Sequence, residues 1–201
     1  MLKKIFGLAP KLESDGSYSP SKLALKLGTV RKTDFDHTSY PKYEGSKSKV
    51  LVLFTEQKNM KMQNGTLFST GNHPVEALVP MLHLQNAGFE FVIVSPTGKP
   101  VVFEQWAFPY DDENVKGIYE AYKLNFEQPT SLKSFVETSL SEVDSYAAVF
   151  VPGGHGSMLG IPEDNNVGKL LNWAHQNDLF TITLCHGPGA LLSTTLDNQK
   201  F

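Results

Sequence analysis

The residues best suited to chemistry in this chain are Cys185 and His186, which directly follow an apolar run over 179–184. Cys185 is the only cysteine among 201 residues, which excludes an internal disulfide and a thiolate metal cluster. Gly187 and Gly189 predict a sharp strand-to-helix turn, the setting of a nucleophile elbow. Free N–H groups at the start of the following helix favour a thiolate. We therefore expect a nucleophilic Cys185 with a lowered pKa; the alternative is a packed thiol that closes the strand.

A second glycine-rich turn and His186 would assist such a thiol. Gly153 and Gly154 follow another apolar run, over 146–151. Successive glycines after a strand can point backbone N–H groups inward as an oxyanion hole, whereas their spacing here does not fit a dinucleotide motif. His186 would serve as a base only on an irregular backbone, because adjacent helical residues do not face one another. A tight turn without chemistry and a packed histidine are the alternatives.

Glu76 is the carboxylate that the predicted elements bring to the same place. It lies in the first turn of a helix predicted over 74–87, since Pro74 suits the first helical position and Gly88 a C-terminal cap. Functional crevices of open parallel sheets lie beyond the carboxyl ends of the strands. We expect Glu76 at that edge; the alternative is a carboxylate that only complements the helix dipole.

Alternating strands and helices predict an α/β fold with a doubly wound parallel sheet. Continuous apolar runs are typical of strands covered on both faces. The expected strands cover 50–55, 89–95, 146–151 and 179–184, and the expected helices cover 74–87, 131–140, 165–177 and the segment after Cys185. Residues 96–130 are expected to be irregular and rich in aromatic side chains.

The composition is that of a globular protein. Hydrophobic residues make up 40% and charged residues 19%, which excludes wholesale disorder. With 18 basic and 21 acidic residues the formal charge is -3, so we expect no specific nucleic-acid binding. No apolar run approaches the ~20 residues of a membrane span, and with the lone cysteine this predicts a cytoplasmic protein. We expect an N-terminal arm over 1–47 and an α/β domain over 48–201.

Three motifs in this order resemble the ThiJ/PfpI superfamily: STGNHPVE at 69–76, FVPGGHG at 150–156 and LCHGP at 184–188. More narrowly, they resemble its HchA-type branch of heat-shock chaperones, glyoxalase III enzymes and protein deglycases. The resemblance runs from about residue 34 to the chain end. The long arm and the aromatic insert at 96–130 also fit that branch.

The resemblance implies a flavodoxin-like fold of the class I glutamine amidotransferase type, in a homodimer. It assigns the nucleophile to Cys185, the triad histidine to His186 and a protonated glutamate that contacts the thiol to Glu76. Backbone N–H groups of Gly153 and Gly154 would form the anion site. The implied activities are glutathione-independent conversion of methylglyoxal to lactate, removal of early glycation adducts from proteins and nucleotides, and holding of unfolded proteins.

The chain departs from this branch at a metal site that some members carry. Those members use two histidines and one carboxylate near the insert, and the matching positions here are Gln85, Glu90 and Tyr122. Only the carboxylate is retained. We therefore expect no metal and no other cofactor.

A second departure concerns the triad acid. Members of the branch continue beyond the nucleophile helix and take that acid from the later part, so we expect this chain to be C-terminally shortened. Asp197 is the only carboxylate after Cys185. Along a helix it would lie roughly 18 Å away, so we do not expect it to orient His186.

Two other functions stay open. A holding chaperone would use apolar surface around Trp106, Phe108 and Tyr110 of the insert. A catalytically inactive or weak homologue would follow from the missing acid. A cysteine peptidase ranks below both, because nothing in the sequence indicates a peptide-binding strand.

Overall fold

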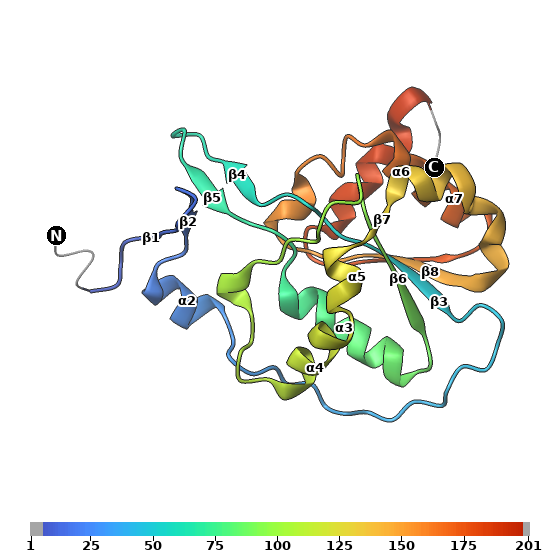
Figure 1. Ribbon diagram of the computed structural model, residues 1–201, viewed down its shortest axis with the longest axis horizontal. Helices are drawn as coiled ribbons and strands as arrows, with labels where there is room; N and C mark the ends of the chain where they lie inside the picture. The colour runs from blue at the N-terminus through green and yellow to red at the C-terminus, as the bar shows by residue number, and fades with distance from the viewer. Residues whose placement is uncertain (1–5, 199–201) are drawn as a thin grey trace.

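Parallel strands build the central sheet of the computed structural model, which describes residues 6–198 and the side chains of 6–196 (Figure 1). The strand order is β7-β6-β3-β8-β9, and each neighbouring pair is parallel. The doubly wound α/β fold is thereby confirmed, with four strands where the apolar runs predicted them. The bounds are β3 Lys49–Leu53, β6 Glu90–Ser95, β7 Thr130–Ser131, β8 Tyr146–Val151 and β9 Phe180–Thr183.

Alternate residues of the central strand β3 enter two separate cores. Val50 and Val52 face the core that includes α3 and α4, whereas Leu51 and Leu53 face the core that includes α6 and α7. Figure 1 shows these helix pairs on opposite sides of the sheet. Burial on both faces explains the continuous apolar run of this strand. The bounds are α3 Pro74–Asn86, α4 Glu113–Ala121, α6 Leu132–Thr138 and α7 Asn165–Gln176.

Helix α3 begins where the sequence predicts it. Pro74 occupies the start of the helix and Glu76 lies in the first turn. The preceding residue, His73, donates its backbone N–H to the carbonyl of Gly153 at 3.0 Å. This bond ties the start of α3 to the turn that follows β8, so the first turn of the helix lies at the carboxyl edge of the sheet.

The insert at 96–130 is more regular than the sequence predicts. Asp112 caps α4, because its Oδ1 accepts the backbone N–H groups of Asn114 and Val115. Val115 and Ile118 then bury one face of the helix in the core. The prediction of an irregular insert was wrong because polar residues between these positions hide the helical period. The other elements of the insert are η1 Gln105–Ala107 and α5 Lys123–Glu127.

The N-terminal arm also contains regular structure. Ser21 caps a short helix, α2, by accepting the N–H of Ala24. Two strands of the arm join a hairpin in a small second sheet of order β1-β2-β5-β4. Further along, the N–H and hydroxyl of Thr33 both donate to Oδ2 of Asp112, at 2.9 and 2.5 Å. The bounds are β1 Lys11–Leu12, β2 Tyr18–Ser19, α2 Lys22–Gly28, β4 Asn59–Lys61 and β5 Leu67–Ser69.

The helix predicted after Cys185 is a 3-10 helix, η4 Gly187–Asn198. The hydroxyls of Ser193, Thr194 and Thr195 each donate to the carbonyl three residues earlier. Two further 3-10 segments are η2 Leu140–Ser145 and η3 His155–Met158. None of the helices between residues 6 and 198 combines the length and apolarity needed to cross a membrane.

Leu51→Ala should lower the free energy of unfolding by about 2–5 kcal/mol, because it opens a cavity under the central strand. Leu51 is fully buried. Urea unfolding followed by circular dichroism measures the change. Leu27→Ala is the matched control: Leu27 is 79% exposed, so its loss should cost less than about 0.5 kcal/mol. Equal unfolding midpoints for the two variants would contradict the placement of Leu51.

Candidate active site

Cys185 occupies a strained turn directly after β9. Its φ is 51°, in the left-handed region that non-glycine residues seldom adopt. The turn is closed on both sides: Leu184 donates its N–H to the carbonyl of Val151, and Gly187 donates to the carbonyl of Leu184 at 2.7 Å. The exposed thiol therefore lies at the carboxyl edge of the sheet. The predicted strand-to-helix elbow is confirmed in position.

The turn after β8 approaches Cys185 so closely that it requires glycine. A Cβ atom on Gly153 would overlap Oε2 of Glu76 and lie 2.6 Å from the Cβ of Cys185. Gly154 has a φ of 107°, which glycine alone adopts without strain. This conformation directs the backbone N–H of Gly154 to the thiol. The arrangement provides a hydrogen-bond donor for negative charge at the sulfur or at an adduct on it.

Glu76 extends from the first turn of α3 toward the thiol of Cys185, where its carboxylate acts on the pKa of the thiol by charge and by hydrogen bonding. Its Oε2 atom is buried and has no hydrogen-bond partner within the described residues. A carboxylate that only complemented a helix dipole would face solvent. The position of Glu76 favours participation in proton transfer at the sulfur.

His186 also lies beside the sulfur. Its Nδ1 atom is 3.6 Å from Sγ of Cys185. Adjacent residues can pair in this way because the left-handed Cys185 interrupts the regular backbone. The structure thus brings together all five residues that the sequence predicts for the site: Glu76, Gly153, Gly154, Cys185 and His186.

The lowered pKa expected for Cys185 is wrong in direction. Partial burial, then the negative charge of Glu76 and its hydrogen bond raise the pKa of this thiol. The backbone N–H groups of His186 and Gly154 act in the opposite sense but are outweighed. The following helix is of the 3-10 type, and the carboxylate of Glu76 acts on the sulfur from α3. The resting site therefore favours the protonated thiol.

Sequence reasoning missed Glu104, a fully buried carboxylate in the insert. Its Oε1 accepts from Nδ1 of His155 at 2.8 Å, from the backbone N–H of His155 at 3.0 Å and from the hydroxyl of Thr70 at 3.2 Å. The ring of His155 lies 5.2 Å from the ring of His186, measured between centroids. A parallel bridge between Asn72 and Phe103 brings the insert to this place. No local spacing in the sequence signals such a long-range bridge.

The three positions matched to a metal site lie near one another but hold different groups. The side chain of Gln85 bonds to Tyr122, and Glu90 contributes its charge to the same place. Burial raises the pKa of the Tyr122 phenol against these hydrogen bonds. An amide and a half-buried phenol are weaker metal ligands than two imidazoles. Within residues 6–198 the structure contains no cluster of three His, Cys, Asp or Glu side chains that could hold a metal.

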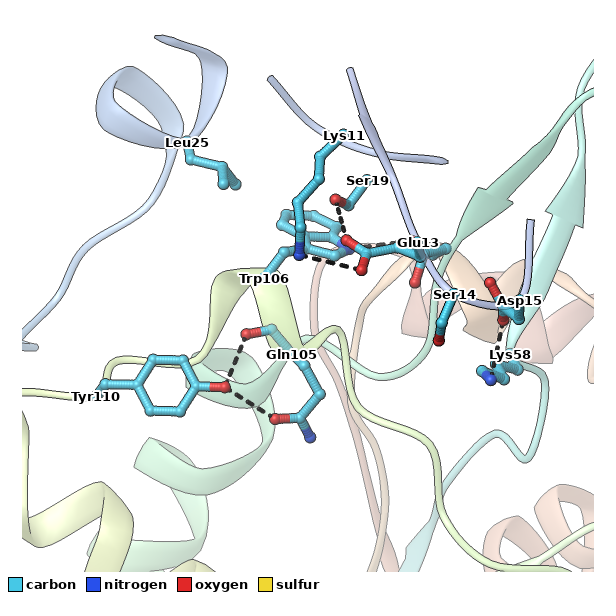
Figure 2. Close-up of a pocket in the computed structure, with 11 residues that line it drawn as sticks. Lys11, Glu13, Ser14, Asp15, Ser19, Leu25, Lys58, Gln105, Trp106 and Tyr110 are labelled. Carbon is cyan, nitrogen blue, oxygen red and sulfur yellow. Dashed lines mark hydrogen bonds and ion pairs between the residues drawn. The ribbon is translucent and has the colours of Figure 1, made fainter. Parts of the chain in front are cut away.

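A cavity of about 430 Å³ lies between the arm, the β4–β5 hairpin and the insert (Figure 2). Its carboxylates are already paired: Glu13 bonds Lys11 and Ser19, and Asp15 bonds Lys58. Trp106 lines this cavity, and its ring lies 6.3 Å from that of His155. None of the five predicted site residues lines this cavity.

The chain is similar in sequence to a known family and to curated proteins. The model of the DJ-1/PfpI family matches residues 65–200. The protein/nucleic acid deglycase HchA of Pseudomonas aeruginosa (strain LESB58) is 46% identical over 191 residues, which are 94% of this chain and 65% of that protein. The protein of the same name from Escherichia coli O1:K1 / APEC is 43% identical over 182 residues, 90% of this chain and 64% of that one. The chain thus spans 64–65% of the length of these curated relatives.

Solved structures share the fold at lower identity. Glyoxalase III from Candida albicans superposes with a TM-score of 0.57 at 22% identity, over 73% of this chain and 60% of that one. The Rapid Encystment Protein of 24 kDa from Francisella tularensis gives a TM-score of 0.58 at 22% identity, over 72% and 61%. Both likenesses support the parallel sheet flanked by helices.

Glu76→Gln should lower the pKa of Cys185, because it removes the negative charge and the hydrogen bond that oppose the thiolate. The pH dependence of alkylation by iodoacetamide measures this pKa. Glu90→Gln is the matched control, since Glu90 begins β6 at the amino edge of the sheet. A midpoint that stays constant or rises in Glu76→Gln would show that no carboxylate charge acts on the sulfur.

Proposed function

Because the chain belongs to the DJ-1/PfpI family, we propose that it is a cysteine-dependent enzyme of the glyoxalase III or deglycase type. Its substrates would be methylglyoxal and early glycation adducts of proteins or nucleotides. The observation that carries the proposal is the convergence on one sulfur, Cys185 Sγ, of His186, Glu76 and the backbone N–H of Gly154. The relatives at 43–46% identity, which are named protein/nucleic acid deglycase HchA, support it.

The first step is addition of the sulfur to the aldehyde carbon of methylglyoxal. His186 accepts the thiol proton, a C–S bond forms, and the carbonyl electron pair moves to the oxygen. The N–H of Gly154 stabilises the resulting oxyanion, which then takes up a proton to give a hemithioacetal. A thiol that rests protonated needs such a base, in agreement with the raised pKa of Cys185.

The second step moves hydrogen within the adduct. Glu76 takes the proton from the former aldehyde carbon, the electron pair passes to the neighbouring keto oxygen, and an enediol forms. The proton then returns to the second carbon, which leaves a lactoyl thioester. The first carbon is oxidised and the second reduced, so no external oxidant is consumed. Water finally breaks the C–S bond, releasing lactate and the free thiol.

A weakly active or inactive protein is the second candidate. Within the described residues, His186 contacts Cys185 and the ring of His155, and no carboxylate bonds to it. The side chain of Asp197 lies outside the described part of the chain. An unoriented His186 would accept the thiol proton less often, so turnover would fall.

The proposal further includes a cytoplasmic homodimer that can hold unfolded proteins. Exposed apolar side chains support a holding role, with Tyr110 55% and Phe180 75% exposed. Phe108, which the sequence placed in such a surface, is instead buried in the core with Val115. The indole Nε1–H of Trp106 donates to the carbonyl of Ser69. The apolar surface of the insert is therefore smaller than predicted.

Purified protein should form lactate from methylglyoxal without glutathione, and Cys185→Ala should reduce this rate at least about 10³-fold. An enzymatic lactate assay measures the rate. His175→Gln, on the exposed face of α7, is the control and should retain the parental rate. Lactate formation that persists in Cys185→Ala would eliminate the mechanism. Absence of lactate from the folded parent chain would favour the inactive candidate.

A further inference from the structure

Resting on the proposed function, we infer that His155 is a further substrate-binding residue. It is a cation held in place by Glu104, and it binds the oxygen on the carbon next to the aldehyde carbon of the substrate. The site would accordingly select aldehydes that carry an oxygen on the neighbouring carbon, as α-oxoaldehydes do. It would favour most those in which this neighbouring oxygen is negatively charged. Neither the triad nor the glycine turn accounts for this pair of residues.

His155 stands next to the reacting atoms. It directly follows Gly154, whose backbone N–H faces the thiol of Cys185. Its ring lies 5.2 Å from that of His186, and its side chain is 38% exposed. A ligand covalently attached to the sulfur would therefore extend past this ring.

Glu104 holds the ring in one orientation and one protonation state. The carboxylate is fully buried, and three donors converge on its Oε1. A buried carboxylate is stable only with a cation or several donors beside it. The Nδ1–H of His155 donates to Glu104, whereas Nε2 of His155 has no hydrogen-bond partner within the described residues. Nε2 is thus the atom available to a ligand.

The charged groups around His155 favour its imidazolium form. The hydrogen bond that His155 donates to Glu104 raises the pKa of His155, partial burial lowers it, and the negative charges of Glu104 and Glu76 raise it further. Glu104 acts from the insert and Glu76 from α3, while His186 faces the ring from the turn after β9.

This placement matches the charge that develops in the proposed reaction. When the proton leaves the first carbon of the hemithioacetal, negative charge appears on the neighbouring oxygen. A fixed imidazolium N–H stabilises such an oxygen more than it stabilises the neutral ketone. An aldehyde without a second oxygen would gain nothing from His155.

Two alkylating probes of nearly equal shape test the inference without turnover. Iodoacetate carries a carboxylate and iodoacetamide a neutral amide, and both react with the same Cys185 thiolate. The ratio of their rates therefore cancels any change in the amount of thiolate. His155→Gln should lower the iodoacetate-to-iodoacetamide ratio by about 3- to 10-fold at low salt, because it removes a cation near the sulfur. Glu104→Gln should lower the ratio in the same direction.

His175→Gln is the matched control and should leave the ratio unchanged, since His175 lies on the exposed face of α7. An unchanged ratio in folded His155→Gln would overturn the inference, while the lactate assay judges the proposed function separately. His155→Gln should also lower kcat for methylglyoxal in a parent chain that forms lactate. If Glu104→Gln fails to fold, His155→Gln alone decides, because its side chain is partly exposed.

Discussion

The close approach of the turns after β8 and β9 is the constraint on which the rest of the site depends. A Cβ atom on Gly153 would collide with Glu76, and one on Gly187 would collide with the carbonyl of Val151. Only backbone without side chains fits between these two turns. This contact holds Cys185 in its left-handed conformation, directs the N–H of Gly154 to the sulfur and leaves room for the carboxylate of Glu76. Parallel pairing of β8 with β9 sets the two turns side by side.

The site places opposite charges around one sulfur. Glu76 and partial burial hold the thiol protonated, while backbone N–H groups oppose them. His155, fixed by Glu104, adds a cation beyond His186. The nucleophile of such a site rests as a neutral thiol, so its proton must pass to a neighbouring group when the sulfur reacts. This arrangement suits the addition and removal of protons on a bound aldehyde.

The sequence predicted those parts of the molecule that follow from local pattern. The runs of β3, β6, β8 and β9 are apolar because both faces of the sheet are covered, and α3 begins at a proline. The five expected site residues meet because parallel strands share one carboxyl edge. Long-range effects were not predictable: Glu104 reaches the site through the bridge at Phe103, and the pKa of Cys185 depends on its contact with Glu76. Helices α4 and α5 are short and contain charged residues, so the spacing of their few apolar residues does not by itself indicate a helix.

Asp112 divides its two oxygens between distant parts of the chain. Oδ1 caps α4, and Oδ2 accepts both donors of Thr33 in the arm. These bonds hold the pKa of Asp112 below its usual value although burial raises it. A chain that starts at residue 48 would lack both donors of Thr33, so the buried carboxylate of Asp112 would keep only its two donors in α4. We expect this loss to loosen the first turn of α4. Anyone trimming this protein for crystals or fusions should therefore cut before Thr33, because the arm is a structural neighbour of the insert that carries Glu104.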